Sequence, residues 1–398
     1  MSQSKLTPTT VGIVGGGPAG LLLSHLLSLS GIDSVVVDNR SRREIEDTVR
    51  AGILERDSVR LLVESGVSDR VLTEGHEHAG IDLRFGGISH RIDFQALVGE
   101  SVWLYPQNDV FIDLADARER DGGDIRFGIH GTKVVDITSS KPGILFTDAA
   151  GTEHEIRCEF LVGADGSRSI CRMQVPEGNR RHYFREYPFA WFGVLAEAPR
   201  SAPELIYTHS ENGFALISQR TDVLQRMYFQ CDPDENAAAW PEDRIWTEFQ
   251  ARVAGEDGFT LNEGRIVDQM VLPFRSFVGE PMRYGNLLLA GDAAHTVPPT
   301  GAKGLNLALA DVRVLAEVLE RAVRNRELDA LDEYSPRALA RVWKAQHFSY
   351  WMTRMLHRLP SSSPFDTRRQ IGELESVVTS TAGSTYLAEC YTGWPGKQ

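Results

Sequence analysis

The sequence has few cysteines, no long apolar run and no excess of basic charge. Its four cysteines, Cys158, Cys171, Cys231 and Cys390, show no CxxC pairing, so neither a zinc site nor a disulfide framework is indicated and no metal centre is expected. Reduced thiols in a cytoplasmic protein are the simpler interpretation. The first ten residues lack the apolar stretch of a signal peptide. No apolar segment approaches the roughly 20 residues that a membrane span needs, and the net charge of −13 argues against nucleic acid as a partner.

The most informative stretch near the N-terminus is an apolar strand followed by a glycine-rich turn. Residues 11–38 read as strand, turn, helix and strand, with Gly15-x-Gly17-x-x-Gly20 at the turn and Asp38 at the end. In such a βαβ unit the glycines allow close approach to a pyrophosphate, and the acid accepts ribose hydroxyls. The unit predicts dinucleotide binding without separating FAD from NAD. The expected elements are a strand at 11–14, a helix at 21–29 and a strand at 34–37.

Two further acids stand at the carboxyl ends of apolar runs, where open α/β sheets bind their ligands. They lie in Asp165-Gly166 and in Gly291-Asp292, after expected strands at 160–162 and 287–289. Taken alone, Asp165-Gly166 could be an ordinary turn. The order GxGxxG, then DG, then GD is similar to that of the flavoprotein aromatic monooxygenases, in which three such motifs hold one FAD. The resemblance implies that Asp38 binds the adenosine ribose, that Asp165 lies near the pyrophosphate and that Asp292 binds the ribityl chain.

The segment GDAAHTVPPTGAKGLN, residues 291–306, resembles the flavin-contacting loop of the family members that hydroxylate 4-hydroxybenzoate. The other matching segments are RAGILE (50–55), ELIYTHSENGFALISQR (204–220), RSFVGEPM (275–282), WKAQHFSYWMTRMLHR (343–358) and AECYTGWP (388–395). The resemblance implies that Pro299 presents a carbonyl to the substrate and that Lys303 adds positive charge near the flavin. Amides at Gly301 and Gly304 would approach the ring, where a helix N-terminus stabilises negative charge. The remaining contacts that the resemblance implies are Thr300 to the substrate, and Arg50, Gln107, Arg226, Leu305 and Asn306 to the cofactor.

A second group of residues fits an aromatic carboxylate. The fork of Arg220 suits bidentate capture of a carboxylate, although by sequence alone it could be an ordinary surface arginine. The resemblance implies that Arg220, Ser218 and Tyr228 bind the carboxylate of the substrate. It also implies that a phenol is held by Tyr207 and Tyr391, with His78 ending a proton chain near neutral pH.

The expected fold class is α/β, with a Rossmann-like FAD-binding domain, a mixed or antiparallel β-sheet substrate domain and a C-terminal helical region. A hairpin is expected around Gly86-Gly87, and helices over 309–324 and over 339–357 after Pro336. The resemblance also implies a homodimer, to which part of the aromatic stripe of the last helix could contribute. The expected segments are 1–79 and 105–185 for FAD binding, 80–104 for the hairpin, 186–274 for the substrate sheet, 275–310 for the flavin-contacting strand, loop and helix start, and 311–398 for the helical region.

The resemblance implies FAD-dependent hydroxylation of 4-hydroxybenzoate to 3,4-dihydroxybenzoate. A reduced nicotinamide, NADH or NADPH, would reduce the flavin, and O2 would then give a flavin 4a-hydroperoxide. Three alternatives stay open: a related para-substituted benzoate such as 4-aminobenzoate, an NAD-dependent dehydrogenase, and a non-catalytic flavoprotein. The dehydrogenase leaves Asp165 and the segment 291–306 unexplained.

The resemblance implies that the segment after the second strand, residues 39–50, helps to choose between NADH and NADPH. No second complete GxGxxG exists in the chain, so the nicotinamide must bind without a Rossmann domain of its own. NADPH-using relatives carry arginine, tyrosine and arginine where this sequence has Asn39, Glu44 and Thr48. The loss of two cations disfavours a 2′-phosphate and favours NADH. A rebuilt phosphate site remains an alternative, since arginines also stand at positions 40, 42 and 43.

Overall fold

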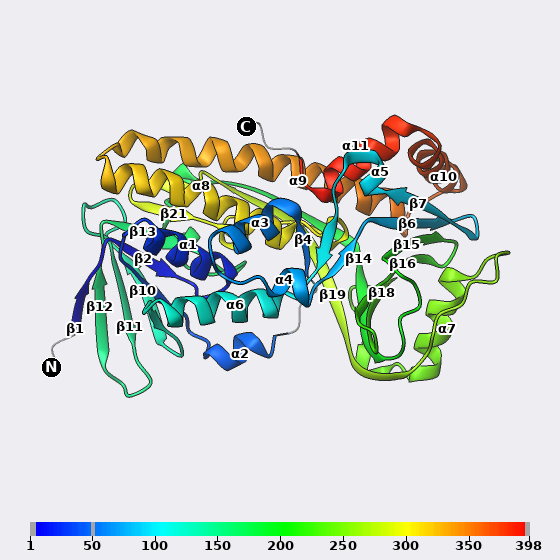
Figure 1. Cartoon of the computed structure of the whole chain (residues 1–398), viewed down its shortest axis with the longest axis horizontal. Coiled ribbons are helices and arrows are strands. Elements are labelled where there is room, and N and C mark those ends of the chain that lie inside the picture. The colour runs from blue at the N-terminus through cyan, green and yellow to red at the C-terminus, as the bar shows by residue number, and fades with distance from the viewer. Residues whose placement is uncertain (1–4, 49–51, 395–398) are drawn as a thin grey trace.

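The computed structural model describes residues 5–48 and 52–394, and it divides into two halves joined by long strands (Figure 1). The first half is built on a six-stranded sheet in the order β20-β21-β13-β2-β3-β9, parallel except at its β20 edge. Its four central strands, β21, β13, β2 and β3, are buried along their whole length. The bounds are β2 (Val11–Val14), β3 (Ser34–Val37), β9 (Asp124–Arg126), β13 (Phe160–Gly163), β20 (Arg283–Tyr284) and β21 (Leu287–Leu289).

Helices and two small sheets complete the first half, which we call the FAD-binding half after the expectation from the sequence. Helix α1 packs against both α6 and α8, so the glycine-rich turn at its start is held from two sides. The helices are α1 (Pro18–Leu29), α2 (Arg42–Glu46), α3 (Arg56–Glu64), α4 (Arg70–Thr73), α6 (Gln107–Arg120) and α8 (Gly304–Arg324). One small sheet contains β1 (Lys5–Pro8), β12 (Glu153–Arg157), β11 (Gly143–Thr147) and β10 (His130–Val135), and the other contains β4 (Ile53–Glu55), β8 (Val102–Leu104) and β5 (His76–His78).

The second half is a mostly antiparallel sheet in the order β22-β19-β14-β18-β16-β15-β6-β7, with β17 paired to β18. One face packs against C-terminal helices and the other against α7. The strands are β6 (Gly80–Phe85), β7 (Ile88–Asp93), β14 (Arg181–Glu197), β15 (Ile206–Ser210), β16 (Gly213–Ile217), β17 (Gln219–Thr221), β18 (Leu224–Cys231), β19 (Arg265–Glu280) and β22 (His295–Thr296). The helices are α5 (Phe94–Val98), α7 (Glu242–Val253), α9 (Tyr334–Leu356), α10 (Pro364–Thr379) and α11 (Thr381–Thr392).

Strands β14 and β19 cross between the halves as one long antiparallel ribbon (Figure 1). Near one end, β14 pairs with β18. At the other end β19 pairs with β22, which opens the loop at 297–303. Helix α9 lies along the same direction and contacts the 3-10 turn in that loop. No helix in the two described ranges is long and apolar enough to cross a membrane.

The structure confirms the expected strands at 11–14, 34–37 and 287–289, and it confirms the hairpin. Gly86 and Gly87 both have positive φ, as a two-residue hairpin turn requires. The hairpin itself is shorter than the expected 80–104, because α5 and β8 follow it. Three helices begin earlier than expected, at Pro18, at Gly304 and at Tyr334. Pro336 is therefore inside the first turn of α9, where it removes no intrahelical hydrogen bond.

Candidate active site

The glycine-rich turn between β2 and α1 shows where a dinucleotide would fit. A Cβ at Gly15 would lie 2.1 Å from the Ala164 carbonyl oxygen, and one at Gly20 would lie 1.9 Å from the Gly15 carbonyl oxygen. These two glycines are required by the packing of the turn itself. A Cβ at Gly17 would meet no atom within 4 Å. It faces the open space at the N-terminus of α1, which is where a helix binds phosphate.

Asp38 is placed beside this turn, and its carboxylate is already engaged. One oxygen accepts the Gly16 amide at 2.8 Å. Arg40 donates from its backbone at 2.9 Å, from Nε at 3.1 Å and from a terminal nitrogen at 3.0 Å. A carboxylate offers about four acceptor positions, so a ribose hydroxyl would have to share or displace the Arg40 side chain. Sequence reasoning did not identify this pairing.

The two later acids differ in their surroundings. Asp165 accepts hydrogen bonds from the Ser169 hydroxyl at 2.6 Å and from the amides of Ile170 and Cys171. Its carboxylate therefore shapes the turn after β13. Asp292 is half-buried in the turn after β21, where Gly291 has a φ of +60°.

The turn at Gly291 is fixed by a buried ion pair that sequence reasoning missed. Asp311 on α8 accepts the Gly291 amide at 2.9 Å and contacts His295 Nε2 at 2.6 Å. Burial lowers the pKa of His295, but the Asp311 carboxylate outweighs it and the pKa is raised. The pair therefore favours the charged form and ties the turn to α8.

The loop between β22 and α8 has glycines of two kinds. A Cβ at Gly301 would lie 2.7 Å from the Ser349 hydroxyl of α9, so a side chain there would push the helix away. A Cβ at Gly304 would meet nothing within 4 Å. Gly304 begins α8, and Leu305 follows it in the first turn, where amides lack intrahelical acceptors. A planar ring with negative charge at its edge fits this position.

The other loop residues face protein on at least one side. The Pro299 carbonyl accepts the Ala302 amide at 2.9 Å, which leaves one lone pair for a ligand. Thr300 is fully buried, and its hydroxyl lies 2.9 Å from that of Thr353 on α9.

Lys303 does not project freely toward the cofactor space. Its ammonium donates to Glu55 Oε1 at 2.7 Å and to the Tyr391 carbonyl at 2.8 Å, with both charged side chains 2% exposed. The other Glu55 oxygen accepts from Arg341 at 2.7 Å. Burial lowers the pKa of Lys303, opposed by the Glu55 carboxylate. Two cations share one anion here, so the group keeps net positive charge near the start of α8.

The expected hydrogen bond from the Asn306 side chain to the flavin is not available in this structure. The Asn306 Oδ1 accepts from the Glu55 amide at 2.9 Å and the Ser58 hydroxyl at 2.7 Å. Its Nδ2 donates to the carbonyls of Ile53 and Ala302. All donors and acceptors of the amide are used. Asn306 thus fixes α8 to β4, and its backbone amide in the first turn is its remaining link to the site.

The residues expected to bind a carboxylate lie together on the large sheet. Ser218 donates its hydroxyl to the Arg226 carbonyl at 2.6 Å, and Arg226 Nε donates to the Tyr228 hydroxyl at 3.2 Å. Arg220 reaches across to the FAD-binding half and donates to Asn108 at 2.8 Å. Burial lowers the pKa of Arg220, with Asp109 opposing. Asn108 lies at the start of α6 and was not predicted, because no local pattern connects positions 108 and 220.

The two terminal nitrogens of the Arg226 guanidinium contact side chains of β19 rather than the space expected for the cofactor. Its guanidinium lies 3.2 Å from Asp268 and 3.3 Å from the Met270 sulfur. Gln107 stands at the first position of α6, beside Asn108. The expected contact at Arg50 lies outside the described residues.

The two tyrosines expected at the phenol form a pair in the protein interior. Their hydroxyls, on Tyr207 and Tyr391, are 2.7 Å apart, and both side chains are about 1% exposed. Burial raises the pKa of both. They therefore stay protonated and can pass a proton only as a hydroxyl chain.

His78 departs from the expected neutral-pH titration. Burial lowers its pKa to about 4. Its Nε2 is 2.9 Å from the Gln219 side-chain nitrogen, while its Nδ1 is buried without a protein partner. Within residues 5–48 and 52–394, no direct hydrogen bond joins His78 to the tyrosine pair. A relay to His78 would therefore need an intervening group, with the ring acting as a neutral imidazole at pH 7.

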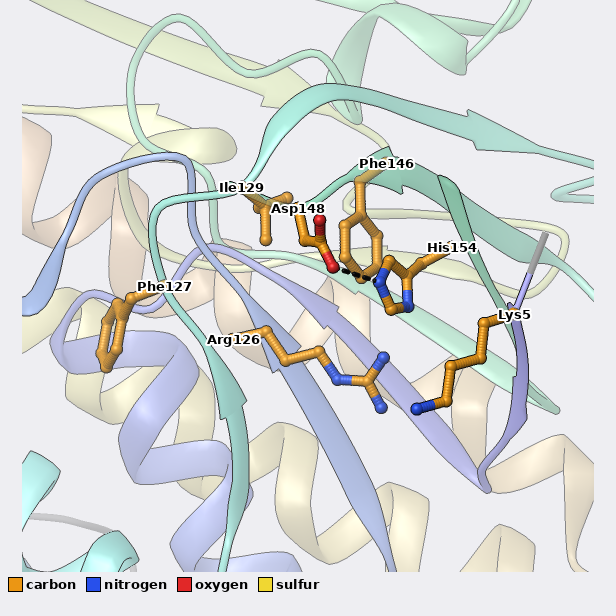
Figure 2. A pocket seen from close by; sticks show the side chains of 7 residues that line it. All are labelled: Lys5, Arg126, Phe127, Ile129, Phe146, Asp148 and His154. Atoms are coloured by element: carbon orange, nitrogen blue, oxygen red, sulfur yellow. Dashed lines mark hydrogen bonds and ion pairs between the residues drawn. The ribbon is translucent and has the colours of Figure 1, made fainter. Parts of the chain in front are cut away.

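A separate hollow of about 350 Å3 opens at the outer sheet of the FAD-binding half (Figure 2). Two of its lining residues are in ion pairs, since Arg126 binds Asp124 and His154 binds Asp148. None of the predicted site residues lines it. The lining residues are Lys5, Arg126, Phe127, Ile129, Phe146, Asp148 and His154.

Comparison with known proteins decides what this arrangement is. A family model described as an FAD binding domain matches residues 8–349. The p-hydroxybenzoate hydroxylase of Acinetobacter baylyi is 42% identical over 388 residues, which cover 97% of this chain and 96% of that protein. The chain belongs to the flavoprotein aromatic monooxygenases. The 6-methylpretetramide 4-monooxygenase of Streptomyces rimosus is 29% identical over 87% of this monooxygenase and 84% of its own length.

A solved structure agrees with this fold. That of p-nitrophenol 4-monooxygenase from Pseudomonas putida superposes with a TM-score of 0.81, at 20% identity, over 98% of this monooxygenase and 100% of that chain. As a family member, this monooxygenase uses FAD, a reduced nicotinamide and O2. The open space before Gly17 fits the pyrophosphate of FAD, and that before Gly304 fits its flavin ring. When bound, FAD supplies the redox chemistry, and the protein supplies orientation and exclusion of water.

Proposed function

We propose that this monooxygenase hydroxylates 4-hydroxybenzoate to 3,4-dihydroxybenzoate. One observation carries the proposal: an arginine-centred group and a buried pair of tyrosine hydroxyls share one face of the large sheet. Tyr207 pairs in register with Leu216, which pairs with Tyr228. The two tyrosines are thus two strands apart, about 10 Å between backbones. This spacing supports a single ring with para substituents between them. The name of the Acinetobacter baylyi relative supports the same substrate.

The residues would divide the work between the two ends of the substrate. Arg220 would exchange Asn108 for the substrate carboxylate, with the Tyr228 hydroxyl as a further donor. The Ser218 hydroxyl, which here donates to the Arg226 carbonyl, would have to turn to the carboxylate to join them. Tyr207 would meet the para hydroxyl and share its proton with Tyr391. Because an anionic phenol makes the ring more electron-rich, withdrawing that proton favours attack by the ring on an electrophilic oxygen. The related substrate 4-aminobenzoate would use the same carboxylate group, and it remains the second candidate.

The deciding experiment is aerobic oxidation of NADH by the purified holoenzyme with a panel of benzoates. We expect 4-hydroxybenzoate to stimulate NADH oxidation strongly and to yield the 3,4-dihydroxy product. A much better yield from 4-aminobenzoate, or from a phenol without a carboxylate, would overturn the assignment. NADH oxidation that no benzoate stimulates would indicate a flavoprotein without this activity.

Tyr391→Phe should uncouple the reaction. The variant removes one hydroxyl of the pair but keeps the ring, so binding of FAD and of 4-hydroxybenzoate should stay within about twofold. Product formed per NADH consumed should fall, because the phenol proton loses its acceptor chain. Tyr187→Phe is the matched control, since the hydroxyl of that buried tyrosine bonds to the Ser276 hydroxyl, at 3.1 Å, and is separate from the Tyr207–Tyr391 pair. Full coupling in Tyr391→Phe would rule out the tyrosine relay.

NADH should serve at least as well as NADPH. Arg42 is bound by three carboxylates, those of Glu46, Asp116 and Glu119. Arg40 is held on Asp38, and Arg43 is 89% exposed. Carboxylates thus already neutralise most of the positive charge of the arginines that could bind a 2′-phosphate.

The measurement is kcat/KM for both donors at saturating 4-hydroxybenzoate. A tenfold preference for NADPH would refute the proposal. Glu44 caps α2 by accepting from the Ser41 backbone at 2.7 Å. Glu44→Gln should raise the NADPH-to-NADH ratio by up to about fivefold. The same change at Glu64, exposed at the end of α3, should not.

We also propose a homodimer in the cytoplasm. Exposed aromatic and apolar side chains occur on β14, β19 and α9, namely Tyr183, Phe184, Leu272 and Trp343. The rings of Tyr183 and Trp343 are in contact, with centroids 5.2 Å apart, and exposed apolar side chains that lie together suit an interface. All four cysteines are free thiols, which suits a reducing compartment. Sedimentation at micromolar concentration tests the dimer, and a monomer there would contradict it.

A further inference from the structure

His357 is a fully buried histidine immediately after α9, among aromatic rings. Its ring stacks on Phe214, with centroids 4.2 Å apart, and on Phe189 at 4.7 Å. The ring of Phe274 meets it edge-on at 6.0 Å. A histidine in so apolar an interior is costly unless its nitrogens are bonded. The functional residues described so far make no use of it.

Both ring nitrogens of His357 are hydrogen-bonded, and the partners fix its tautomer. Trp191 Nε1 is only a donor, and it lies 2.7 Å from His357 Nε2. The other nitrogen, Nδ1, is 3.0 Å from the Thr353 carbonyl, which can only accept. The proton must therefore be on Nδ1. Burial lowers the pKa of His357 to about 3, so the ring keeps its lone pair for Trp191 at every physiological pH.

Trp191 lies between His357 and Tyr228, one of the residues proposed to bind the substrate carboxylate. Its ring centroid lies 5.0 Å from that of Tyr228 and 5.2 Å from that of Phe214. On β14 it stands two residues from Gly193, which pairs with Tyr228. A Cβ at Gly193 would lie 3.0 Å from the Tyr228 ring. The indole therefore occupies the same sheet face as the carboxylate-binding residues.

Thr353 leads from His357 to the loop before α8. It lies one helical turn before His357, and its hydroxyl is 2.9 Å from that of Thr300. A continuous chain of contacts thus runs from Trp191 through His357 and Thr353 to Thr300. It connects the substrate sheet to the flavin-contacting loop through the end of α9.

We infer that His357 is a positioning residue that holds Trp191 as a wall of the substrate chamber and couples this wall to the loop at Thr300. The inference rests on the proposed function for the identity of the chamber. The ring of His357 is enclosed by Phe189, Phe214 and Trp191, so we place it behind this wall rather than at the substrate. It acts by accepting the indole N–H, which stops the large Trp191 ring from rotating out of the chamber.

The direct test is the indole N–H signal of Trp191 in 15N-labelled holoenzyme, identified by its loss in Trp191→Phe. A hydrogen bond to an imidazole nitrogen should move this signal downfield and protect it from exchange with solvent. His357→Phe should return it upfield, and His357→Gln, whose amide can accept the same bond, should largely restore it. This measurement requires no substrate. It therefore separates failure of the inference from failure of the proposed function.

Substrate binding gives the second readout, with 4-hydroxybenzoate as the probe. His357→Phe should weaken its Kd about tenfold, since a buried donor loses its acceptor. In the Trp191→Phe background, which has no N–H to hold, the same change should cost less than about twofold. His209→Phe is the matched control: it is also buried and bonded to α9, at the Leu356 carbonyl, but it has no bond to Trp191.

The outcomes are distinct. An unshifted, rapidly exchanging Trp191 signal in the parent enzyme would overturn the inference. So would an equal loss of binding from His357→Phe in both backgrounds, because that would indicate general destabilisation. If His357→Phe fails to fold, Trp191→Phe and His357→Gln carry the test, since both keep the volume close to the original. A Trp191→Phe variant that binds 4-hydroxybenzoate normally would also overturn it.

Discussion

Arg220→Lys should weaken binding of 4-hydroxybenzoate by about ten- to a hundredfold, the equivalent of one lost charge-assisted hydrogen bond of about 1.5–3 kcal/mol. The planar fork of arginine can face a carboxylate with two donors, whereas a lysine ammonium is a single point of charge. The structure adds a reason. Arg220 extends as far as Asn108 in the FAD-binding half, the partner that the carboxylate would replace, and a shorter, unforked side chain would not reach that position with two donors. The measurement is the Kd from the change in flavin absorbance on titration.

A buried arginine on the opposite side of the same sheet provides the control. Arg252 on α7 is 7% exposed and bonds to Glu248, with its guanidinium 4.8 Å from the Phe229 ring. Arg252→Lys changes the same chemical group but is remote from the carboxylate-binding face, so the Kd should stay unchanged. Equal effects of the two variants would indicate a general loss of stability. No effect of Arg220→Lys would remove Arg220 from the substrate site.

Gly17→Ala should abolish FAD retention while leaving the polypeptide folded. The added methyl would meet no protein atom within 4 Å. It would occupy the space before the N-terminus of α1, where the pyrophosphate must approach the backbone. The measurement is the flavin content of the purified protein together with its thermal unfolding in the presence of excess FAD. We expect a colourless protein whose Tm no longer responds to FAD.

The other two glycines of the turn should fail differently. Gly20→Ala brings a methyl to 1.9 Å from the Gly15 carbonyl oxygen, and Gly15→Ala adds strain at a φ of +112°. Both should destabilise the fold itself, by several kcal/mol where the backbone must move. If Gly17→Ala unfolds as readily as Gly20→Ala, the open space at Gly17 is needed by the protein and not by a cofactor.

Much of the cofactor-binding half could be predicted from the sequence because its signals are local. The strands at 11–14 and 287–289 are short apolar runs bounded by glycine, and they end where expected. The hairpin at Gly86 and Gly87 has its own turn chemistry. Helix starts were less predictable. Residues 304–308, expected as loop, form the first turn of α8. The Asn306 side chain anchors this turn to β4, a contact between positions about 250 apart in the chain.

The parts of the site that were missed depend on such distant contacts. From the sequence, Lys303 is expected to be an unpaired cation, but in the structure it forms a buried ion pair with Glu55. His78 reads as a neutral-pH group until its burial is known. Asn108 and Trp191 acquire their significance only from partners on other strands and helices. Composition and spacing identify which residue types can serve a carboxylate or a flavin, but the tertiary fold decides which of their atoms remain unoccupied.

The ribbon of β14 and β19 also has an evolutionary consequence. It pairs with β18 of the substrate sheet at one end and with β22, at the entrance to the flavin loop, at the other. In our proposal, the distance between the flavin loop and the substrate sheet is thus set by the backbone hydrogen bonds of the ribbon, which side-chain substitutions leave intact. Evolution toward a longer or bulkier acid cannot lengthen this ribbon by shifting its register one residue at a time. A one-residue shift would turn every side chain of the strand to the opposite face of the sheet. New substrates must therefore be accommodated by smaller side chains around the substrate, and Trp191 is the largest such side chain on the ribbon.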